Sequence, residues 1–233
     1  MERLDKAFSS CKIFSRTEIQ KIIKQKRVKV NGVIVNDYSF KVDVLSDEIL
    51  LDGNKVEFNK FKYIMLNKPQ GVVSATEDRN DVSVIDILPS SMKREGLFPV
   101  GRLDKDTVGL VIITDDGVSA HNNLSPKRHA EKVYYFETAD SVSEETASEI
   151  EKGVLLKDGY TTKPCKVKLL SATSGEITLT EGKYHEIKRI FGAKSNKITY
   201  LKRISFKGIM LDETLKEGEA RYLTKAEEEI FIK

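Results

Sequence analysis

The chain has 233 residues, 39% of them hydrophobic, which is long enough for more than one average domain and apolar enough for a sizeable core. Its two cysteines, Cys11 and Cys165, lie in different regions without metal-ligand spacing, which argues against a disulfide framework and a zinc site. The sequence shows neither the pattern of a signal peptide nor a run of about 18 apolar residues that could span a membrane. These features predict a cytoplasmic protein without membrane contact, and a net charge of only +3 does not by itself indicate a nucleic-acid partner.

The charge is nevertheless unevenly distributed along the chain. Residues 12–29 hold seven basic residues against one acidic residue, a net charge of +6. Residues 181–207 hold eight basic residues against two acidic ones, again +6. A single charge run is often only a solvated face, but two such runs in separate segments favour two basic surfaces that bind a polyanion.

The first 59 residues are predicted to form a compact unit of two helices and a small sheet. Apolar residues at helical spacing from Leu4 to Cys11 indicate the first helix. Ser15 and Glu18 have the spacing of a capping box, which predicts that a second, basic helix begins there. Residues 27–35, RVKVNGVIV, are predicted to form a hairpin that turns at Asn31-Gly32.

A second domain is predicted over residues 60–233, because a charged stretch gives way near Asn59-Lys60 to an apolar strand. Strands and short helices then alternate, which predicts an α+β class with a mixed sheet. The predicted strands are 63–66, 110–114, 132–137, 166–170 and 176–179, and the predicted helices are 82–88, 143–152 and one near the C-terminus capped by Thr224 and Glu227.

The segment Gly101 to Gly117, GRLDKDTVGLVIITDDG, places the carboxylate of Asp104 in a polar turn before a buried strand. Arg102 precedes it, so a cation and a carboxylate can face one cleft from a loop held by rigid structure. A lone Arg-Leu-Asp is more often a turn in which Asp accepts backbone N–H bonds. Agreement with distant segments decides between this turn and a catalytic role.

Three such segments are LNKPQG at 66–71, EKVYY at 131–135 and EGKYHEIKRIF at 181–191. Together with GRLD they resemble, in kind and order, the motifs of pseudouridine synthases of the RsuA type. The resemblance extends over essentially the whole chain, including TKP at 162–164, and residues 1–59 resemble the S4 RNA-binding domain. For that first unit, a small basic protein-binding module is the alternative.

The resemblance implies isomerisation of uridine to pseudouridine around a central cleft, without a cofactor or a metal ion. Asp104 matches the family's essential aspartate, Lys188 the basic residue paired with it, and Tyr134 a tyrosine expected to stack on the uracil. Arg189 is the fallback for the basic partner, and Lys132 is expected to serve the fold or phosphates. Taken singly, Lys188 could be an ordinary surface charge and Tyr134 a core aromatic residue.

The implied partner is ribosomal RNA or an assembling small ribosomal subunit, bound by a protein that we expect to be a monomer. Arg102 is the candidate wedge that enters the space left by a flipped base. The other residues expected to contact RNA are Lys183, His185 and Arg189 in the catalytic domain, and Arg16, Lys24 and Arg27 in the first domain.

The resemblance is closest to the branch that modifies small-subunit 16S rRNA, because Tyr184-His185 stands where large-subunit relatives more often have Asn-Arg. Glu186, where Gln is usual, is expected to put a negative charge beside the RNA path, and the stretch 193–196 lacks the usual Gly before Asn. The alternatives are a 23S rRNA pseudouridine synthase, a non-catalytic RNA-binding ribosome-assembly protein, and a metal-dependent nuclease or phosphotransferase using Asp104 and Asp106.

Overall fold

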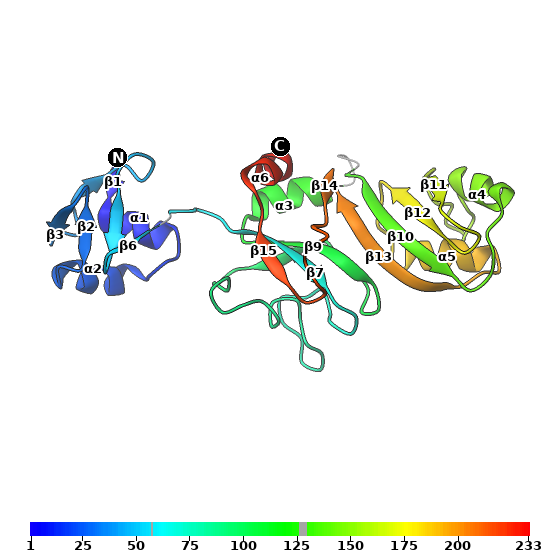
Figure 1. Cartoon of the computed structure of the whole chain (residues 1–233), viewed down its shortest axis with the longest axis horizontal. Coiled ribbons are helices and arrows are strands. Elements are labelled where there is room, and N and C mark those ends of the chain that lie inside the picture. The colour runs from blue at the N-terminus through cyan, green and yellow to red at the C-terminus, as the bar shows by residue number, and fades with distance from the viewer. Residues whose placement is uncertain (57, 126–129) are drawn as a thin grey trace. The chain divides into compact units, whose positions relative to one another are not determined.

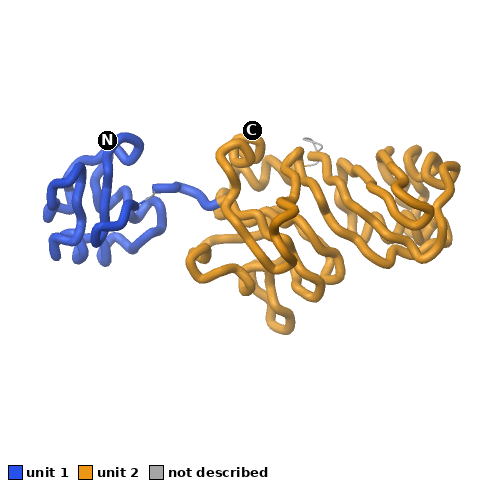
Figure 2. The backbone as a smooth tube through the Cα atoms, in the orientation of Figure 1, with its two compact units in different colours: residues 1–62 blue, residues 63–233 orange. Residues whose placement is uncertain are grey.

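A computed structural model describes residues 1–56, 58–125 and 130–233 of the chain (Figure 1). The chain forms two compact units, Met1–Lys62 and Tyr63–Lys233 (Figure 2). The boundary predicted at Asn59-Lys60 lies just before this division. Among the described residues, no helix is long and apolar enough to cross a membrane.

The first unit contains the two predicted helices, α1 (Leu4–Ser10) and α2 (Arg16–Lys24). Both bonds of the predicted capping box are present, because Ser15 Oγ accepts from the Glu18 backbone N–H and a Glu18 carboxylate oxygen accepts from that of Ser15. The hairpin turns at Asn31 and Gly32, whose φ angles of 49° and 80° are those of a two-residue turn. The strands are β1 (Glu2–Arg3), β2 (Val28–Val30), β3 (Val33–Val35), β4 (Lys41–Val42), β5 (Ile49–Leu51) and β6 (Asn54–Lys55).

The second unit is built on a nine-stranded mixed sheet in the order β11-β12-β10-β13-β9-β7-β15, with β14 on β13 and β8 on β9. Only the β9–β13 pairing is parallel among the described pairs of strands, which confirms the α+β class with a mixed sheet. Its strands are β7 (Tyr63–Lys68), β8 (Phe98–Val100), β9 (Val108–Thr114), β10 (Lys132–Thr138), β11 (Lys166–Leu169), β12 (Ser174–Leu179), β13 (Ile198–Phe206), β14 (Ile209–Met210) and β15 (Ala220–Tyr222). Its helices are α3 (Gly117–Leu124), α4 (Glu144–Glu151), α5 (Glu186–Ala193) and α6 (Lys225–Ile232).

Two adjacent buried strands of this sheet, β9 and β7, position the site. All residues of β7 and β9 are buried, as their apolar runs predict. Helix α5 packs on the sheet, with the Phe191 ring 4.7 Å from that of Phe136 on β10. The GRLD loop leads into β9, and α5 comes directly before β13, the parallel neighbour of β9. The topology therefore brings the loop and the helix to one region of the sheet.

The prediction of a helix over 82–88 is wrong, because this segment forms successive turns. The backbone N–H groups of Asp86 and Leu88 each donate to the carbonyl three residues earlier, at 3.1 and 3.3 Å. The side chains of Ser83 and Asp86 accept from each other's backbone N–H, which offers the backbone an alternative to a helix. Ser83 also bridges to Val73 and Pro89 follows, so the segment is too short to nucleate a helix.

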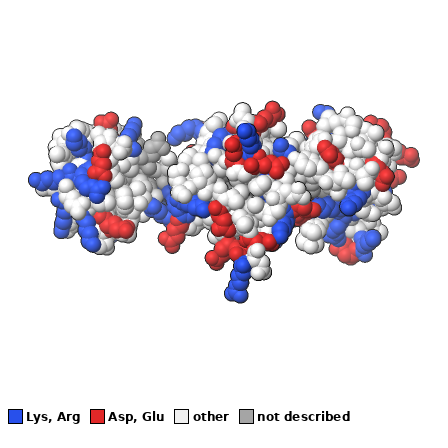
Figure 3. Space-filling view, turned by 60° about the horizontal axis from the view of Figure 1, so that its bottom comes forward, with Lys and Arg blue, Asp and Glu red and all other residues white. Residues whose placement is uncertain are grey.

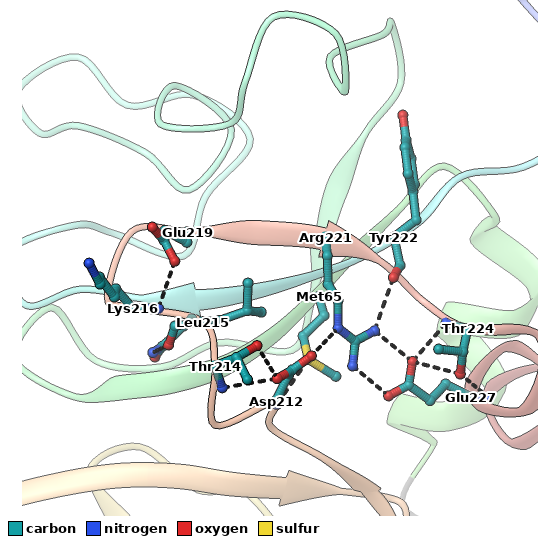
Figure 4. A network of polar contacts seen from close by, with 11 residues as sticks. Met65, Asp212, Thr214, Leu215, Lys216, Glu219, Arg221, Tyr222, Thr224 and Glu227 are labelled. Atoms are coloured by element: carbon teal, nitrogen blue, oxygen red, sulfur yellow. Dashed lines mark hydrogen bonds and ion pairs between the residues drawn. The ribbon is translucent and has the colours of Figure 1, made fainter.

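A polar network ties the C-terminal strand and helix to the sheet (Figure 4). The Arg221 guanidinium on β15 donates to Asp212 at 2.6 Å and to both oxygens of Glu227 on α6 at 2.8 and 2.9 Å. Its bonds lower the pKa of Glu227 to about 2, and hydrogen bonds from Thr214 and Arg221 lower that of Asp212 to about 2. Thr224 completes the predicted capping box of α6 with Glu227.

Replacing Arg221 by Ala should lower the free energy of unfolding at pH 7 by about 1–3 kcal/mol, because two carboxylates lose a partly buried partner. Since both carboxyl pKa values are depressed in the folded state, this contribution is present above about pH 4.5 and is lost as the pH falls toward 2. Urea unfolding at pH 7 and pH 3 should therefore show a smaller difference between variant and wild type at pH 3. Lys105→Ala, which removes an exposed pair with Asp81, is the control with little effect.

Candidate active site

The loop that carries Asp104 is held in place by a buried lysine. Lys68, at the end of β7, is fully buried, and its ammonium donates to the backbone carbonyls of Pro69, Lys105 and Thr107 at 3.1, 3.3 and 2.8 Å. Burial lowers the pKa of Lys68 to about 8. The LNKPQG segment therefore positions the residues on the C-terminal side of Asp104. The sequence motif alone assigned no role to Lys68.

Two further contacts fix the same loop. Ser74 Oγ accepts from the Leu103 backbone N–H at 3.0 Å and donates to the Leu103 carbonyl at 3.1 Å. Gly109, with a φ of +100°, lets β9 approach β13, because a Cβ there would lie 2.4 Å from the Arg203 carbonyl oxygen. The loop is thus anchored on both sides of Asp104.

Helix α5 supplies the cation that meets Asp104. Lys188 Nζ lies 2.9 Å from Asp104 Oδ2 and also bonds Asp106 Oδ1. Burial alone would lower the pKa of Lys188, but its hydrogen bonds to the two aspartates raise it above the ordinary value. The bond from Lys188 lowers the pKa of Asp106. The ammonium therefore stays charged and neutralises a pair of carboxylates at the cleft.

The turn before α5 adds the next polar groups. His185 adopts a left-handed conformation with a φ of 48° at the helix N-cap, and its Nε2 lies 3.5 Å from Asp104 Oδ1. Its ring stacks on exposed Tyr184, with the centroids 3.8 Å apart. The Lys183 ammonium lies 4.9 Å from the centroid of the Tyr160 ring. This turn therefore presents an imidazole beside the aspartate, and Lys183 lines the same cleft.

Six predicted residues line one cleft of about 80 Å³: Arg102, Asp104, Tyr134, Lys183, His185 and Lys188. Tyr134 comes from β10 and is only 9% exposed, whereas Arg102 is exposed on the loop. Arg189 bonds Asp158 and the Tyr184 carbonyl, so the structure pairs Lys188, and not this fallback, with Asp104.

The predicted contacts of the first unit are exposed basic side chains on or next to α2. Arg16 donates to Asp5 at 3.3 Å, and Arg27 forms a two-bond pair with Asp52. The Lys24 ammonium lies 5.6 Å from the centroid of the Tyr38 ring. Lys and Arg side chains gather on the face of this unit seen at the left of Figure 3. The unit therefore presents cations outward, as its sequence predicts.

Glu186, expected to place a negative charge beside the RNA path, is instead a buried acid. It is 5% exposed, and its Oε2 accepts from the Lys183 backbone N–H at 2.8 Å. Burial and the neighbouring Glu181 raise the pKa of Glu186 to about 8. Glu181 is held by the Tyr160 hydroxyl and the Lys163 backbone N–H. Near neutral pH, Glu186 is therefore protonated and resembles the glutamine that it replaces.

Replacing Glu186 by Gln should remove a pH-dependent loss of stability. Because the carboxyl pKa is raised on folding, its stabilising contribution is complete below about pH 4.5 and is lost as the pH rises through about 8. The gap in unfolding free energy, variant minus wild type, should grow by at least ~1 kcal/mol between pH 6 and pH 9. Urea unfolding at both pH values measures this difference in free energy. A difference that is the same at pH 6 and pH 9 would contradict a raised pKa of Glu186.

Among the described residues, no group of three or more His, Cys, Asp or Glu side chains could hold a metal ion. Asp104 and Asp106, the pair considered for metal-dependent chemistry, both bond the Lys188 ammonium. The arrangement is therefore a carboxylate paired with an ammonium beside a buried tyrosine, which suits attack on, or charge stabilisation at, an electron-poor carbon.

Comparison with known proteins identifies the family. The RNA pseudouridylate synthase model matches residues 62–193, and the S4 domain model matches residues 2–49. The chain is 41% identical over 229 residues to YtzG, an uncharacterized RNA pseudouridine synthase of Bacillus subtilis, covering 97% of this chain and 96% of that protein. It is 38% identical over 233 residues to ribosomal small subunit pseudouridine synthase A of Haemophilus influenzae, covering 99% of this chain and 100% of that one.

The corresponding Escherichia coli enzyme, also named ribosomal small subunit pseudouridine synthase A, is 39% identical over 227 residues and 97% of each chain. A solved pseudouridylate synthase aligns over 99% of this chain and 100% of its own, with a TM-score of 0.70 and 37% identity. The two domains of the chain agree with these matches. The chain therefore belongs to the RsuA family of pseudouridine synthases with an S4 domain, and is an RNA pseudouridine synthase, an isomerase.

Proposed function

We propose that the protein converts one specific uridine of ribosomal RNA, in the small-subunit 16S rRNA, to pseudouridine, with Asp104 as the catalytic carboxylate. The observation that carries this proposal is the Lys188 ammonium 2.9 Å from Asp104, in a cleft that Tyr134 also lines. This ion pair fixes the carboxylate where the sugar of the target nucleotide must lie.

The reaction rearranges one nucleotide without adding or removing heavy atoms. The bond between C1′ and N1 of the base breaks, the uracil rotates, and C5 bonds to C1′. The C5 proton leaves to solvent and N1 takes up a proton, so the product has the same atoms as the substrate. Loss of uracil makes C1′ electron-poor, so the Asp104 carboxylate either adds to C1′ or assists removal of the 2′ proton. Tyr134 stacks on the uracil and supports the proton transfer at C5.

The target uridine must leave its stack before Asp104 can reach it, at a cost of a few kcal/mol. Arg102, exposed at the mouth of the cleft, is the side chain proposed to enter the space left by the base. Lys183, His185 and Arg189 are proposed to contact the RNA backbone from the turn and first part of α5. Arg16, Lys24 and Arg27 are proposed to do so from the S4 domain.

The subunit assignment is supported by two observations. The relatives from Haemophilus influenzae and Escherichia coli are named for the small ribosomal subunit. His185 lines the cleft and stacks on exposed Tyr184, and this pair is where large-subunit relatives are expected to differ. The name of the Bacillus subtilis relative specifies no subunit. A 23S rRNA target is therefore the alternative that the experiment must separate.

The protein should be incubated with 16S rRNA, with 23S rRNA and with partly assembled small subunits, followed by chemical mapping of pseudouridine. One new site in 16S rRNA or in the assembling subunit, with none in 23S rRNA, is expected. A site in 23S rRNA alone would move the proposal to the large subunit. No new site in any of the three would leave an RNA-binding role in ribosome assembly.

A further inference from the structure

A second, larger cavity lies next to the Asp104 cleft. Its volume is about 640 Å³, within the range of small-molecule sites in proteins and far larger than the 80 Å³ of the Asp104 cleft. The two share five lining residues: Arg102, Tyr134, Glu181, Gly182 and Lys183. A polymer whose reacting nucleotide occupies the small cleft therefore has an adjoining space for a neighbouring part of the chain.

Arg203 forms part of the cavity wall and has unused hydrogen-bonding capacity. It is 2% exposed, and its Nε donates to the Leu110 carbonyl at 2.7 Å, which fixes the guanidinium. Arg203 is paired in register with Tyr134 on β10, so the two side chains lie on the same face of the sheet. Its buried Nη2 has no hydrogen-bond partner among the described residues. A buried guanidinium with an unsatisfied donor favours an anion in the space that it lines.

The charges around Arg203 also favour an anionic ligand. The cavity is also lined by Arg102, Lys132, Lys163 and Lys183, and Glu181 is the only acidic residue among its described lining residues. Lys132 pairs in register with Phe206, over which its ammonium lies 5.7 Å from the ring centroid. Burial lowers the pKa of Lys132 to about 8. An anionic ligand would offset the electrostatic cost of these clustered cations.

A second unsatisfied group distinguishes a ribonucleotide from a simple anion. Asn123, on α3, is 2% exposed and uses its amide nitrogen to donate to the carbonyls of Ser119 and Phe231. Its buried Oδ1 has no partner among the described residues and is therefore an acceptor that requires a donor. A phosphodiester supplies an anion for Arg203 and no donor for Asn123, whereas a ribose 2′-hydroxyl supplies that donor.

We propose that this cavity binds the ribonucleotide next to the target uridine, with its phosphate on Arg203 and its 2′-hydroxyl on Asn123. This inference rests on the proposed function, because the occupant is a neighbour of the uridine at Asp104. Lys132 and Lys163 add positive charge around the phosphate. The cavity would thus contribute to the choice of RNA site through one bound neighbour, in addition to the flipped base.

The first test measures the affinity for 16S rRNA against salt concentration for the full-length wild type, Arg203→Gln and Lys163→Gln. Removing one cation from a phosphate should reduce the slope of log K against log salt by about 0.7–0.9. Lys163 is exposed, so its variant keeps the test valid if Arg203→Gln does not fold. Lys166→Gln, an exposed lysine on β11 outside the lining, is the matched control and should keep the wild-type slope.

The second test uses unmodified protein and RNA with a single 2′-deoxy substitution on either side of the mapped uridine. A loss of about fivefold or more in affinity at one of the two positions is expected, because one hydrogen bond to the 2′-hydroxyl is removed. Two results would overturn the inference if the protein still forms pseudouridine. One is a wild-type slope of log K against log salt for both Arg203→Gln and Lys163→Gln. The other is the same affinity for each deoxy RNA as for the unsubstituted RNA. Failure of the proposed function is distinguishable, because the unmodified protein would then form no pseudouridine.

Discussion

Asp104→Asn is expected to lower the rate of pseudouridine formation by at least ~10³-fold while the RNA dissociation constant changes by less than about threefold. Asparagine has the shape of aspartate and still accepts a hydrogen bond from Lys188, so the cleft should persist. Its neutral amide can neither add to C1′ nor stabilise positive charge there. Release of the C5 proton from labelled uridine in RNA, measured in a single turnover with saturating enzyme, gives the rate.

Asp106→Asn is the matched control, because Asp106 bonds the same Lys188 ammonium from the same loop. It removes a charge of the same sign without removing the proposed catalytic group, and a loss below about tenfold is expected. The reverse result, a large loss for Asp106→Asn and a small one for Asp104→Asn, would assign the reaction to Asp106. Equal large losses would indicate that both carboxylates are required.

Lys188→Met is expected to reduce the rate at pH 7 by about 10²-fold or more, since two carboxylates on one loop would lose the cation that neutralises them. The hydrogen bond from Lys188 lowers the pKa of Asp106, so its loss lets Asp106 retain a proton to higher pH. Activity of the variant should therefore recover in part as the pH rises, whereas that of the wild type should not show this recovery.

Lys188→Arg is the conservative comparison, because it keeps the positive charge beside the aspartates with different geometry. It should retain more activity than Lys188→Met and a pH profile of wild-type shape. A Lys188→Met protein with near-wild-type rate at pH 7, or a profile parallel to that of the wild type, would contradict the electrostatic role. RNA affinity measured for both variants separates this role from a contact to phosphate.

Most of the fold was predictable because local patterns and tertiary packing agree. The capping boxes at Ser15 and Thr224, the turn at Asn31-Gly32 and the apolar strands β7 and β9 all have short-range signals. The prediction over 82–88 was wrong, because side-chain bonds from Ser83 and Asp86 compete with a helix in a segment that ends at a proline.

Strand β13 was not predicted, although it is central to the sheet. Lys202 and Arg203 interrupt its apolar pattern, and the segment was interpreted as part of a basic surface. In the structure the Arg203 side chain lies inside, on a hydrogen bond to the Leu110 carbonyl. Its burial depends on β9, a parallel neighbour remote in sequence, and local periodicity contains no information about such a partner.

Some residues of the candidate site were likewise predictable from the sequence, and others were not. Asp104, Lys188 and Tyr134 were located by the order of the family motifs, and the structure brings them to one cleft. The roles of Lys68 and the protonated Glu186 were not predicted. Both depend on burial, of Lys68 among backbone carbonyls and of Glu186 beside another acid, which only the folded chain defines. A lysine in a turn motif and a glutamate in a basic helix are otherwise read as exposed charges.

Mapping of pseudouridine at single-nucleotide resolution, in 16S rRNA or small subunits treated with the protein in the presence of a metal chelator and no added cofactor, tests the central claim most directly. We predict one new pseudouridine, formed by the wild type and absent with Asp104→Asn, in RNA of unchanged length. Modification by both proteins alike would contradict the role of Asp104. Cleaved RNA without pseudouridine, or no modification of any ribosomal RNA, would contradict the isomerisation itself.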